Sequence, residues 1–346
     1  MNKVMKITTR RYPSEIGEIT TYRIVNSRGA SVVLSSLGAG ILEVNVPNKM
    51  GKIENVALSY ARPSDYIADG PCMGKIPGRY ANRIAAGKFS IDGREYTLAI
   101  NNGPNHLHGG PTGFQNRIWD SCITSDGVRF SYVSKDGEEG YPGEMTVTAD
   151  YRWTDRNKLV LTLKAVSTKD TIVNLTNHVY FNLRGADSGS ALDHKLRVNG
   201  SKYLVTDENL TPTGEMADVA GTPMDFRKLR AVGSRIRANF PALVYGKGYD
   251  NCWVLDSQEA VVLKEAVSGR KLTVKTDQPG LHIYTGNWLN GCPVNHSGNR
   301  YMDYDGIAVE AQGFPDAPNH PNFPSQLLKA GDTYSRFIAF EFTTES

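Results

Sequence analysis

The chain has 346 residues, of which 40% are hydrophobic and 22% are charged, a composition typical of globular proteins. Its net charge of +3, from 39 basic and 36 acidic residues, does not favour nucleic acid or an acidic membrane surface as a partner. The sequence contains no run of about 18 apolar residues, so no membrane-spanning helix is expected.

Most of the predicted elements are short strands joined by turns. Ser64–Ala68 favours a short helical turn, and Asp92-Gly93 between two β-type runs predicts a tight hairpin. Apolar and polar residues alternate from Met145 to Trp153 and again from Leu159 to Ala165, which predicts two strands with one buried face each. A second short helical turn is expected at Asp225–Val232.

This succession of strands predicts an all-β fold, namely a large antiparallel β-sandwich with few short helices. No repeat, low-complexity tract or linker divides the sequence, so we expect a single domain from residue 1 to 346. The four cysteines are scattered and form no C-x-x-C pair, and no apolar segment follows the basic N-terminal residues Met1 to Pro13. We therefore expect a cytoplasmic protein.

Three of the predicted strands carry an unusual polar face. Glu310 and Gln312 alternate with apolar residues in Ile307–Gln312, and His282 and Tyr284 do so in Leu281–Thr285. Amide, imidazole, phenol and carboxylate groups together suit the recognition of a neutral polyol such as a sugar. In Val173–Leu183 the alternation predicts one polar face, made of Asn174, Thr176, His178, Tyr180 and Asn182.

Two loop-like segments add further candidates, each with an ordinary structural alternative. Gly78–Ile84 supplies Arg79 and Arg83, which are equally compatible with surface ion pairs. Asn101–Gly110 supplies His106 and His108, which would need a third ligand from elsewhere to bind a metal, so no metal site is expected. A strand histidine such as His178 is often structural, whereas a buried glutamate such as Glu310 needs a partner or a task.

The same segments resemble the aldose 1-epimerase (galactose mutarotase) family. The similar motifs run in family order from about Gly38 to Phe342. They are Gly78-Arg-Tyr-Ala-Asn-Arg-Ile-Ala, Asn101 to Gly110, Asn174-Leu-Thr-Asn-His-Val-Tyr-Phe-Asn-Leu, Tyr249-Asp-Asn, Gln278-Pro-Gly-Leu-His-Ile-Tyr-Thr-Gly-Asn and Val309-Glu-Ala-Gln-Gly-Phe-Pro-Asp-Ala.

The resemblance implies a β-sandwich enzyme that interconverts the α and β anomers of free aldoses such as galactose and glucose, without a cofactor. It implies that Glu310 is the general base, that His178 is the general acid, and that His108 assists at the reacting end. It also implies that Asn82, Arg83 and Asp250 bind sugar hydroxyls. The expected partner is a free monosaccharide, and the expected assembly is a monomer or weak homodimer.

One position departs from the family pattern, because animal members carry glutamine where this chain has His282. We expect His282 to contact hydroxyls and to affect sugar preference. The alternatives are a glycoside hydrolase, a non-catalytic sugar-binding protein, and a mutarotase for a phosphorylated or different aldose. If the family roles hold, the catalytic side chains should converge on one groove, with Glu310 and His178 roughly 4–8 Å apart.

Overall fold

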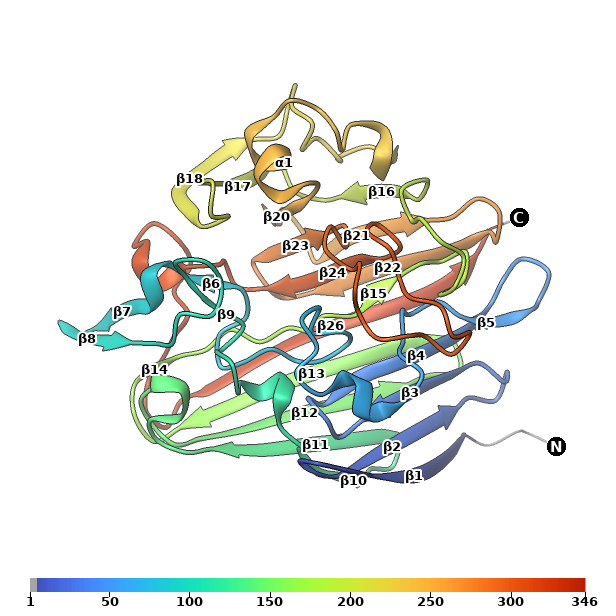
Figure 1. The fold of residues 1–346 in the computed structure, drawn as a ribbon, viewed down its shortest axis with the longest axis horizontal. Coiled ribbons are helices and arrows are strands. Elements are labelled where there is room, and N and C mark those ends of the chain that lie inside the picture. Colours follow the sequence, from blue (N-terminus) through green and yellow to red (C-terminus); the bar gives the residue numbers. More distant parts are fainter. Residues whose placement is uncertain (1–4, 346) are drawn as a thin grey trace.

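The computed structural model describes residues 5–345, and it is built almost entirely from antiparallel strands (Figure 1). Residues 1–4, the beginning of the basic N-terminal segment, lie outside the described residues, as does residue 346. Every strand ladder between named strands of the described chain is antiparallel. This confirms the predicted all-β class.

The largest sheet has nine strands, and its strand order shows that the C-terminal strand lies in the middle. The predicted strands at 145–153 and 159–165 are adjacent strands of this sheet. Their side chains alternate between buried and more exposed, as expected. The order is β10 (Asp120–Ile123), β11 (Gly127–Ser134), β12 (Met145–Trp153), β13 (Lys158–Ser167), β26 (Thr333–Thr344), β22 (Arg270–Thr276), β21 (Glu259–Lys264), β16 (Lys195–Val198) and β19 (Arg230–Ala231).

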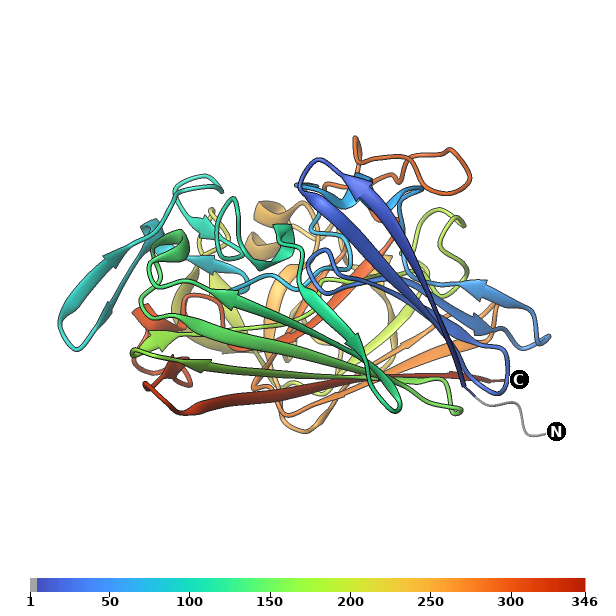
Figure 2. The same cartoon turned by 90° about the horizontal axis from the view of Figure 1, so that it is seen from below.

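Two smaller sheets complete the sandwich. The six-stranded sheet is β15 (Tyr180–Phe181), β24 (Ile307–Gln312), β23 (Gly280–Tyr284), β20 (Asp250–Val254), β17 (Lys202–Thr206) and β18 (Pro212–Asp218). The five-stranded sheet is β1 (Lys6–Ser14), β2 (Gly17–Val25), β3 (Ser31–Ser35), β4 (Gly40–Pro47) and β5 (Ile53–Asn55), and it crosses one side of the nine-stranded sheet (Figure 2).

One apolar core joins these three sheets. Val32 of β3, Leu161 of β13 and Val309 of β24 all belong to it and are fully buried. Because each sheet directs one face of alternating apolar residues inward, the three sheets bury their faces against one another. The polar face of β23 and β24 is thereby left for the loops to cover.

Short pairs of strands and few helical segments make up the remainder. The predicted hairpin at Asp92-Gly93 is β7 (Lys88–Ile91) with β8 (Arg94–Thr97). The other pairs are β6 (Arg83–Ile84) with β9 (His106–Leu107), and β14 (Thr171–Ile172) with β25 (Leu327–Leu328). The helical segments are α1 (Pro241–Gly246) and 3₁₀ helices at Pro63–Tyr66, Ala85–Gly87, Phe114–Asn116, Glu138–Gly140, Val232–Ser234 and Ala317–Asn319.

Some local predictions differ from the structure. The turn expected at Ser64–Ala68 is a 3₁₀ helix one residue earlier, whereas most of Asp225–Val232 is not helical. The expected strand at Val173–Leu183 is wrong for most of its length, because only Tyr180 and Phe181 pair with β24. Among the described residues, no helix is both long enough and apolar enough to cross a bilayer.

Candidate active site

Three neighbouring strands present the first part of the site on a single face. The ladders place Asp250 of β20 opposite Tyr284 of β23, and His282 of β23 opposite Glu310 of β24. Paired residues and residues two apart point to the same side of a sheet, so all four side chains share one face. Glu310 and His282 are 1% and 3% exposed, because loops from other elements cover this face.

His178 reaches the same face from an irregular segment rather than from a strand. Its backbone N–H donates to Lys75 O at 2.9 Å, and its carbonyl accepts from Gly74 N–H at 2.9 Å. Gly74 has a φ of +69°, and a Cβ there would lie 2.0 Å from Ile41 O, so this close approach requires glycine. These contacts fix the imidazole with Nε2 3.5 Å from Glu310 Oε1.

The two loop segments found in the sequence form the opposite wall. Arg83 on β6 donates from Nε to Asn102 Oδ1 at 3.1 Å and places Nη2 3.5 Å from Asp250 Oδ2. His108 Nδ1 accepts from the backbone N–H of Asn82 at 3.1 Å. In a neutral imidazole the other nitrogen then carries the proton, so His108 can donate from Nε2 to a ligand oxygen.

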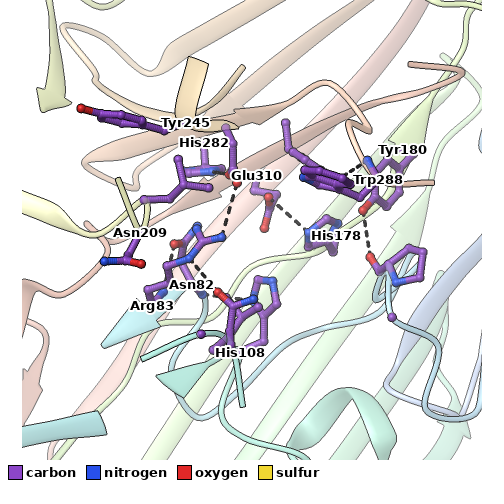
Figure 3. A pocket seen from close by; sticks show the side chains of 18 of the residues that line it. Asn82, Arg83, His108, His178, Tyr180, Asn209, Tyr245, His282, Trp288 and Glu310 are labelled. Atoms are coloured by element: carbon purple, nitrogen blue, oxygen red, sulfur yellow. Dashed lines mark hydrogen bonds and ion pairs between the residues drawn. The ribbon is translucent and has the colours of Figure 1, made fainter. Parts of the chain in front are cut away.

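These side chains surround an open pocket of about 760 Å³ (Figure 3). The seven site residues predicted from the sequence all line it: Asn82, Arg83, His108, His178, Asp250, His282 and Glu310. The rings of His108 and Tyr180 lie 5.3 and 5.0 Å from the ring of His178, measured between centroids. Polar groups and aromatic surfaces therefore converge as recognition of a polyol requires.

Burial strongly shifts the pKa values of Glu310 and His178. It raises the pKa of Glu310 well above its ordinary range, and the charge of Asp250 adds to this effect while Arg83 opposes it. Burial also lowers the pKa of His178 to about 4. Near neutral pH the pair therefore favours its uncharged form, with a single proton held on Glu310 and none on the second His178 nitrogen.

The pKa values of Asp250 and His108 are shifted in directions that suit hydroxyl binding. Burial opposes ionisation of Asp250, but Arg83 and His282 outweigh it and hold the pKa of this carboxyl below its ordinary value. His282 Nε2 donates to Asp250 Oδ1 at 2.6 Å. Burial, followed by the neighbouring His178, keeps the pKa of His108 well below the ordinary value, so this ring is neutral. The pocket thus offers an anionic acceptor and a neutral donor.

Two expectations about the site need correction. Glu310 and His178 lie closer, at 3.5 Å, than the expected 4–8 Å, because the irregular segment brings the imidazole directly over β24. Asn174, Thr176 and Asn182 do not line the pocket. Asn174 Nδ2 donates to Ala81 O at 3.1 Å, and Asn182 Nδ2 donates to Asp305 O at 2.9 Å. Of the polar face predicted for this segment, only His178 and Tyr180 reach the pocket.

His106 and His108 do not share one environment. His106 is fully buried, and its two nitrogens lie 2.6 Å from Ala99 O and 2.7 Å from Tyr141 Oη. His108, two residues on, adopts a positive φ of 53° and turns into the pocket. Within residues 5–345 no group of three His, Cys, Asp or Glu side chains is placed to hold a metal ion.

The sequence did not reveal several aromatic residues of the lining. Trp288 and Tyr245 line the pocket and are 64% and 41% exposed, which is unusual for rings of this size. Tyr245 lies on α1, which the sequence did not predict, and Trp288 lies in the loop after β23. The aromatic residue in Gly286-Asn-Trp-Leu-Asn-Gly291 was the available signal, because a tryptophan in a turn-rich loop has no core face to enter.

The sandwich and its pocket define a carbohydrate-type site, and known proteins identify the family. The family model for aldose 1-epimerase matches residues 20–341. The chain is 40% identical to the galactose mutarotase of Sus scrofa over 96% of each protein, and 36% identical to the aldose 1-epimerase of Escherichia coli (strain K12) over 94% of this chain and 96% of that protein. The crystal structure of galactose 1-epimerase from Lactobacillus acidophilus NCFM has a TM-score of 0.87 and 30% identity, covering 99% of this chain and 100% of that one. The chain belongs to the aldose 1-epimerase family, as its motifs predicted.

Proposed function

We propose that the chain is a mutarotase that interconverts the α and β anomers of free aldohexoses such as galactose and glucose. The observation that carries this proposal is the Glu310–His178 pair, 3.5 Å apart, at the wall of an open pocket lined by hydroxyl-binding groups. Family membership and the galactose mutarotase relatives support it.

The proposed reaction moves only protons and one ring bond. Ionised Glu310 takes the proton of the C1 hydroxyl while protonated His178 donates a proton to the ring oxygen O5. The C1–O5 bond then breaks, leaving an aldehyde at C1 and a hydroxyl on C5. After rotation about C1–C2, His178 takes back the C5 hydroxyl proton, O5 attacks C1, and Glu310 returns its proton to O1. Neither an electron carrier nor a transferred group takes part.

The titration of the pair supports this exchange of roles. Ring opening ends with the proton on Glu310 and a neutral His178, which is the form that burial favours for both groups. During each opening and closure the pair changes between ionised Glu310 with protonated His178 and protonated Glu310 with neutral His178. Both forms therefore take part in the proposed reaction. In the proposed reaction His108 donates from Nε2 to a hydroxyl near the reacting carbon, and Asn82, Arg83 and Asp250 bind the remaining hydroxyls.

The pocket favours this function over glycoside hydrolysis. A hydrolase of the usual kind needs two carboxyl groups that act on the bond. Besides Glu310, the pocket wall nearby offers Asp250, whose two oxygens already face His282 at 2.6 Å and Arg83 at 3.5 Å. A carboxylate held by two such groups suits hydroxyl binding better than attack.

We further propose one domain, a cytoplasmic location, and a monomer or weak homodimer. The shared core of the three sheets supports a single domain. The four cysteines are free thiols in the structure, with Cys72, Cys252 and Cys292 buried and Cys122 exposed, which fits a reducing compartment.

Glu310→Gln tests the proposed base. Glutamine keeps the shape of the side chain but cannot accept a proton, so we expect kcat for galactose to fall on the order of 10²-fold or more. Polarimetry of freshly dissolved α-galactose, corrected for the uncatalysed rate, measures this loss. The control is Glu259→Gln on β21, whose carboxylate pairs with Arg197 outside the pocket. A Glu310→Gln protein that keeps about a third of the wild-type kcat would remove Glu310 from the base role.

A further inference from the structure

The loop that contacts His178 contains a buried ion pair. Lys75 Nζ lies 2.5 Å from Asp69 Oδ1, and both side chains are fully buried. The ammonium also donates to Tyr66 O at 2.6 Å and to Asn116 Oδ1 at 3.2 Å. Neither Asp69 nor Lys75 lines the pocket, so the proposed reaction does not use them directly.

A buried ion pair calls for an explanation other than stability. Taking two charges out of water is costly, and apolar side chains of similar size in their place are often neutral or stabilising. Such a pair can instead fix one arrangement of the chain, because any other arrangement leaves a charge buried without its partner. The role of the Asp69–Lys75 pair therefore lies in the segment whose conformation it fixes.

The pair joins the two ends of a tight loop, residues 69–75. Asp69 Oδ2 accepts from the backbone N–H of Met73 at 2.8 Å and from Tyr60 Oη at 3.1 Å. Inside the loop Cys72 has a φ of +55°, in the left-handed region that residues with a side chain rarely adopt. Such a conformation persists only where the surrounding contacts fix it, and the ion pair closes the loop around it.

The 69–75 loop holds two groups of the pocket. The backbone of His178 bonds to Lys75 through its N–H and to Gly74 through its carbonyl, each at 2.9 Å. Pro71 O accepts from Tyr180 Oη, also at 2.9 Å. The rings of His178 and Tyr180 lie at the same end of the pocket, with centroids 5.0 Å apart (Figure 3). A shift of this loop would therefore displace both rings relative to strand β24.

We propose that Asp69 and Lys75 are positioning residues for the proposed reaction, which hold the imidazole of His178 at the ring oxygen through the 69–75 loop. The inference rests on the proposed function, in which His178 exchanges a proton with O5. The groups proposed to bind the sugar hydroxyls come from other elements, since Arg83 lies on β6 and Asp250 on β20. Loss of the ion pair should therefore slow the chemical step and leave sugar binding unchanged.

A paired substitution tests this inference without leaving one charge buried alone. In Asp69→Asn/Lys75→Met both side chains keep their approximate size, and the amide oxygen at position 69 can still accept from the backbone N–H of Met73. Rates for galactose and glucose are measured by polarimetry of the freshly dissolved α-anomers. They are divided by the folded fraction, taken from near-ultraviolet circular dichroism, so that unfolded protein is not counted as lost turnover.

The matched control removes a second ion pair with a buried cation, in Glu54→Gln/Arg270→Met. Arg270 is 1% exposed, and its Nη2 lies 3.0 Å from Glu54 Oε2. Its Nη1 donates to Leu183 O at 2.9 Å, so it contacts the chain just after β15, whereas the 69–75 loop contacts His178 just before β15. Neither control residue lines the pocket.

We expect Asp69→Asn/Lys75→Met to lower kcat for both sugars by at least about tenfold, because a displacement on the order of 1 Å at a reacting group is enough to cost this much. KM should stay within about twofold of the wild-type value, and the control pair should keep both constants within the same limit. Tyr60→Phe is a milder variant that keeps the ring and removes one donor to Asp69. It should lower kcat about threefold with the same KM, and it decides the question if the paired variant does not fold.

Each other result contradicts a stated part of the argument. A kcat that stays at the wild-type value in the paired variant and in Tyr60→Phe would overturn the positioning role. An equal fall in the control pair would also overturn it, because the loss would then follow from removing any buried ion pair. A KM that rises as much as kcat falls would place the effect on sugar binding instead of on His178. A wild-type protein that accelerates anomer exchange of neither sugar would overturn the proposed function itself.

Discussion

His282 and Arg83 contact Asp250 from two sides, which predicts that His282 is a positioning residue in the pocket. His282 Nε2 donates to Asp250 Oδ1 at 2.6 Å, while Arg83 Nη2 lies 3.5 Å from Oδ2. From the sequence alone, His282 is expected to contact sugar hydroxyls, whereas in the structure its Nε2 contacts Asp250 Oδ1. We therefore expect His282 to act on a sugar through the orientation of this carboxylate.

We expect His282→Gln to change sugar preference more than turnover. Glutamine has a longer, more flexible side chain than histidine, so we expect Asp250 to shift and the ratio of kcat/KM for galactose to that for glucose to change roughly three- to tenfold. Anomer-resolved kinetics on both sugars measure the ratio. His320→Gln is the control, because His320 Nε2 also bonds an aspartate, Asp316 Oδ2 at 3.0 Å, outside the pocket lining. An equal and large fall in kcat for both sugars would instead mark His282 as part of the catalytic machinery.

The shifted pKa values of Glu310 and His178 predict the pH dependence of turnover. The proposed mechanism needs one proton on the pair, so kcat/KM should fall when a second proton binds and when the last one leaves. Because burial lowers the pKa of His178 to about 4, the acidic limb should lie near pH 4. The basic limb should lie well above the ordinary glutamate range, because burial raises the pKa of Glu310.

Polarimetric rates from about pH 3.5 to 9, extrapolated to zero buffer concentration, would check this profile. A plateau through neutral pH is expected. An acidic inflection near 6.5, the ordinary value for histidine, would show that burial does not control the proton on His178.

The segment before β15 positions His178 through buried amides instead of a strand ladder. Asn177 Nδ2 donates to Gly74 O at 2.7 Å and to Tyr151 Oη at 3.2 Å, and its Oδ1 accepts from Val179 N–H at 3.0 Å. Asn177 is fully buried, so these groups have no water to replace it. One side chain therefore performs the role that backbone pairing performs elsewhere in the sheet.

We expect Asn177→Ala to lower the free energy of unfolding by about 1–3 kcal/mol, because a buried carbonyl and N–H lose their partner. Urea unfolding followed by tryptophan fluorescence measures the change. Asn322→Ala is the matched control: Asn322 Nδ2 makes a similar bond, to Gly214 O at 2.8 Å, but in an exposed position. The control should cost less than about 0.5 kcal/mol. Equal losses in the two variants would show that burial of the amide is not what matters.

The same segment shows why part of the fold could be predicted and part could not. β12 and β13 alternate strictly because only one face meets the core, so their sequences predict them well. In β24 all six residues are buried, because loops cover the polar face. Val173–Leu183 also alternates in sequence, yet Asn174, Asn177 and Asn182 bond to backbone carbonyls and replace a ladder. Alternation alone does not reveal that substitution.

The candidate site was more predictable from motifs than from geometry. The motifs identified seven residues that the pocket lining contains. The 3.5 Å approach of His178 to Glu310 depends on backbone contacts with Gly74 and Lys75, and no motif in the sequence associates these two residues with the site. Tyr245 was missed because α1 has only six residues, too few to show a helical period.

In the whole molecule, a strand near the C-terminal end of the described chain lies in the middle of the largest sheet, and strands near the N-terminal end share its core. β26, at residues 333–344, lies between β13 and β22 in the nine-stranded sheet. The same core contains Val32 from the five-stranded sheet and Val309 from the six-stranded sheet. Neither small sheet can expose its inner face without opening the core of the others.

We therefore expect the protein to unfold in one cooperative thermal transition. Because β26 joins strands that lie far apart in sequence, partial unfolding of either half would remove a central strand and expose the shared core. Scanning calorimetry should give one peak, with a calorimetric enthalpy close to the van't Hoff enthalpy. Galactose at saturating concentration should move the whole peak to higher temperature, since a ligand that binds only the folded state stabilises the complete cooperative unit. Two separated peaks, or a galactose shift confined to one of them, would instead divide the chain into two domains, with the pocket in only one.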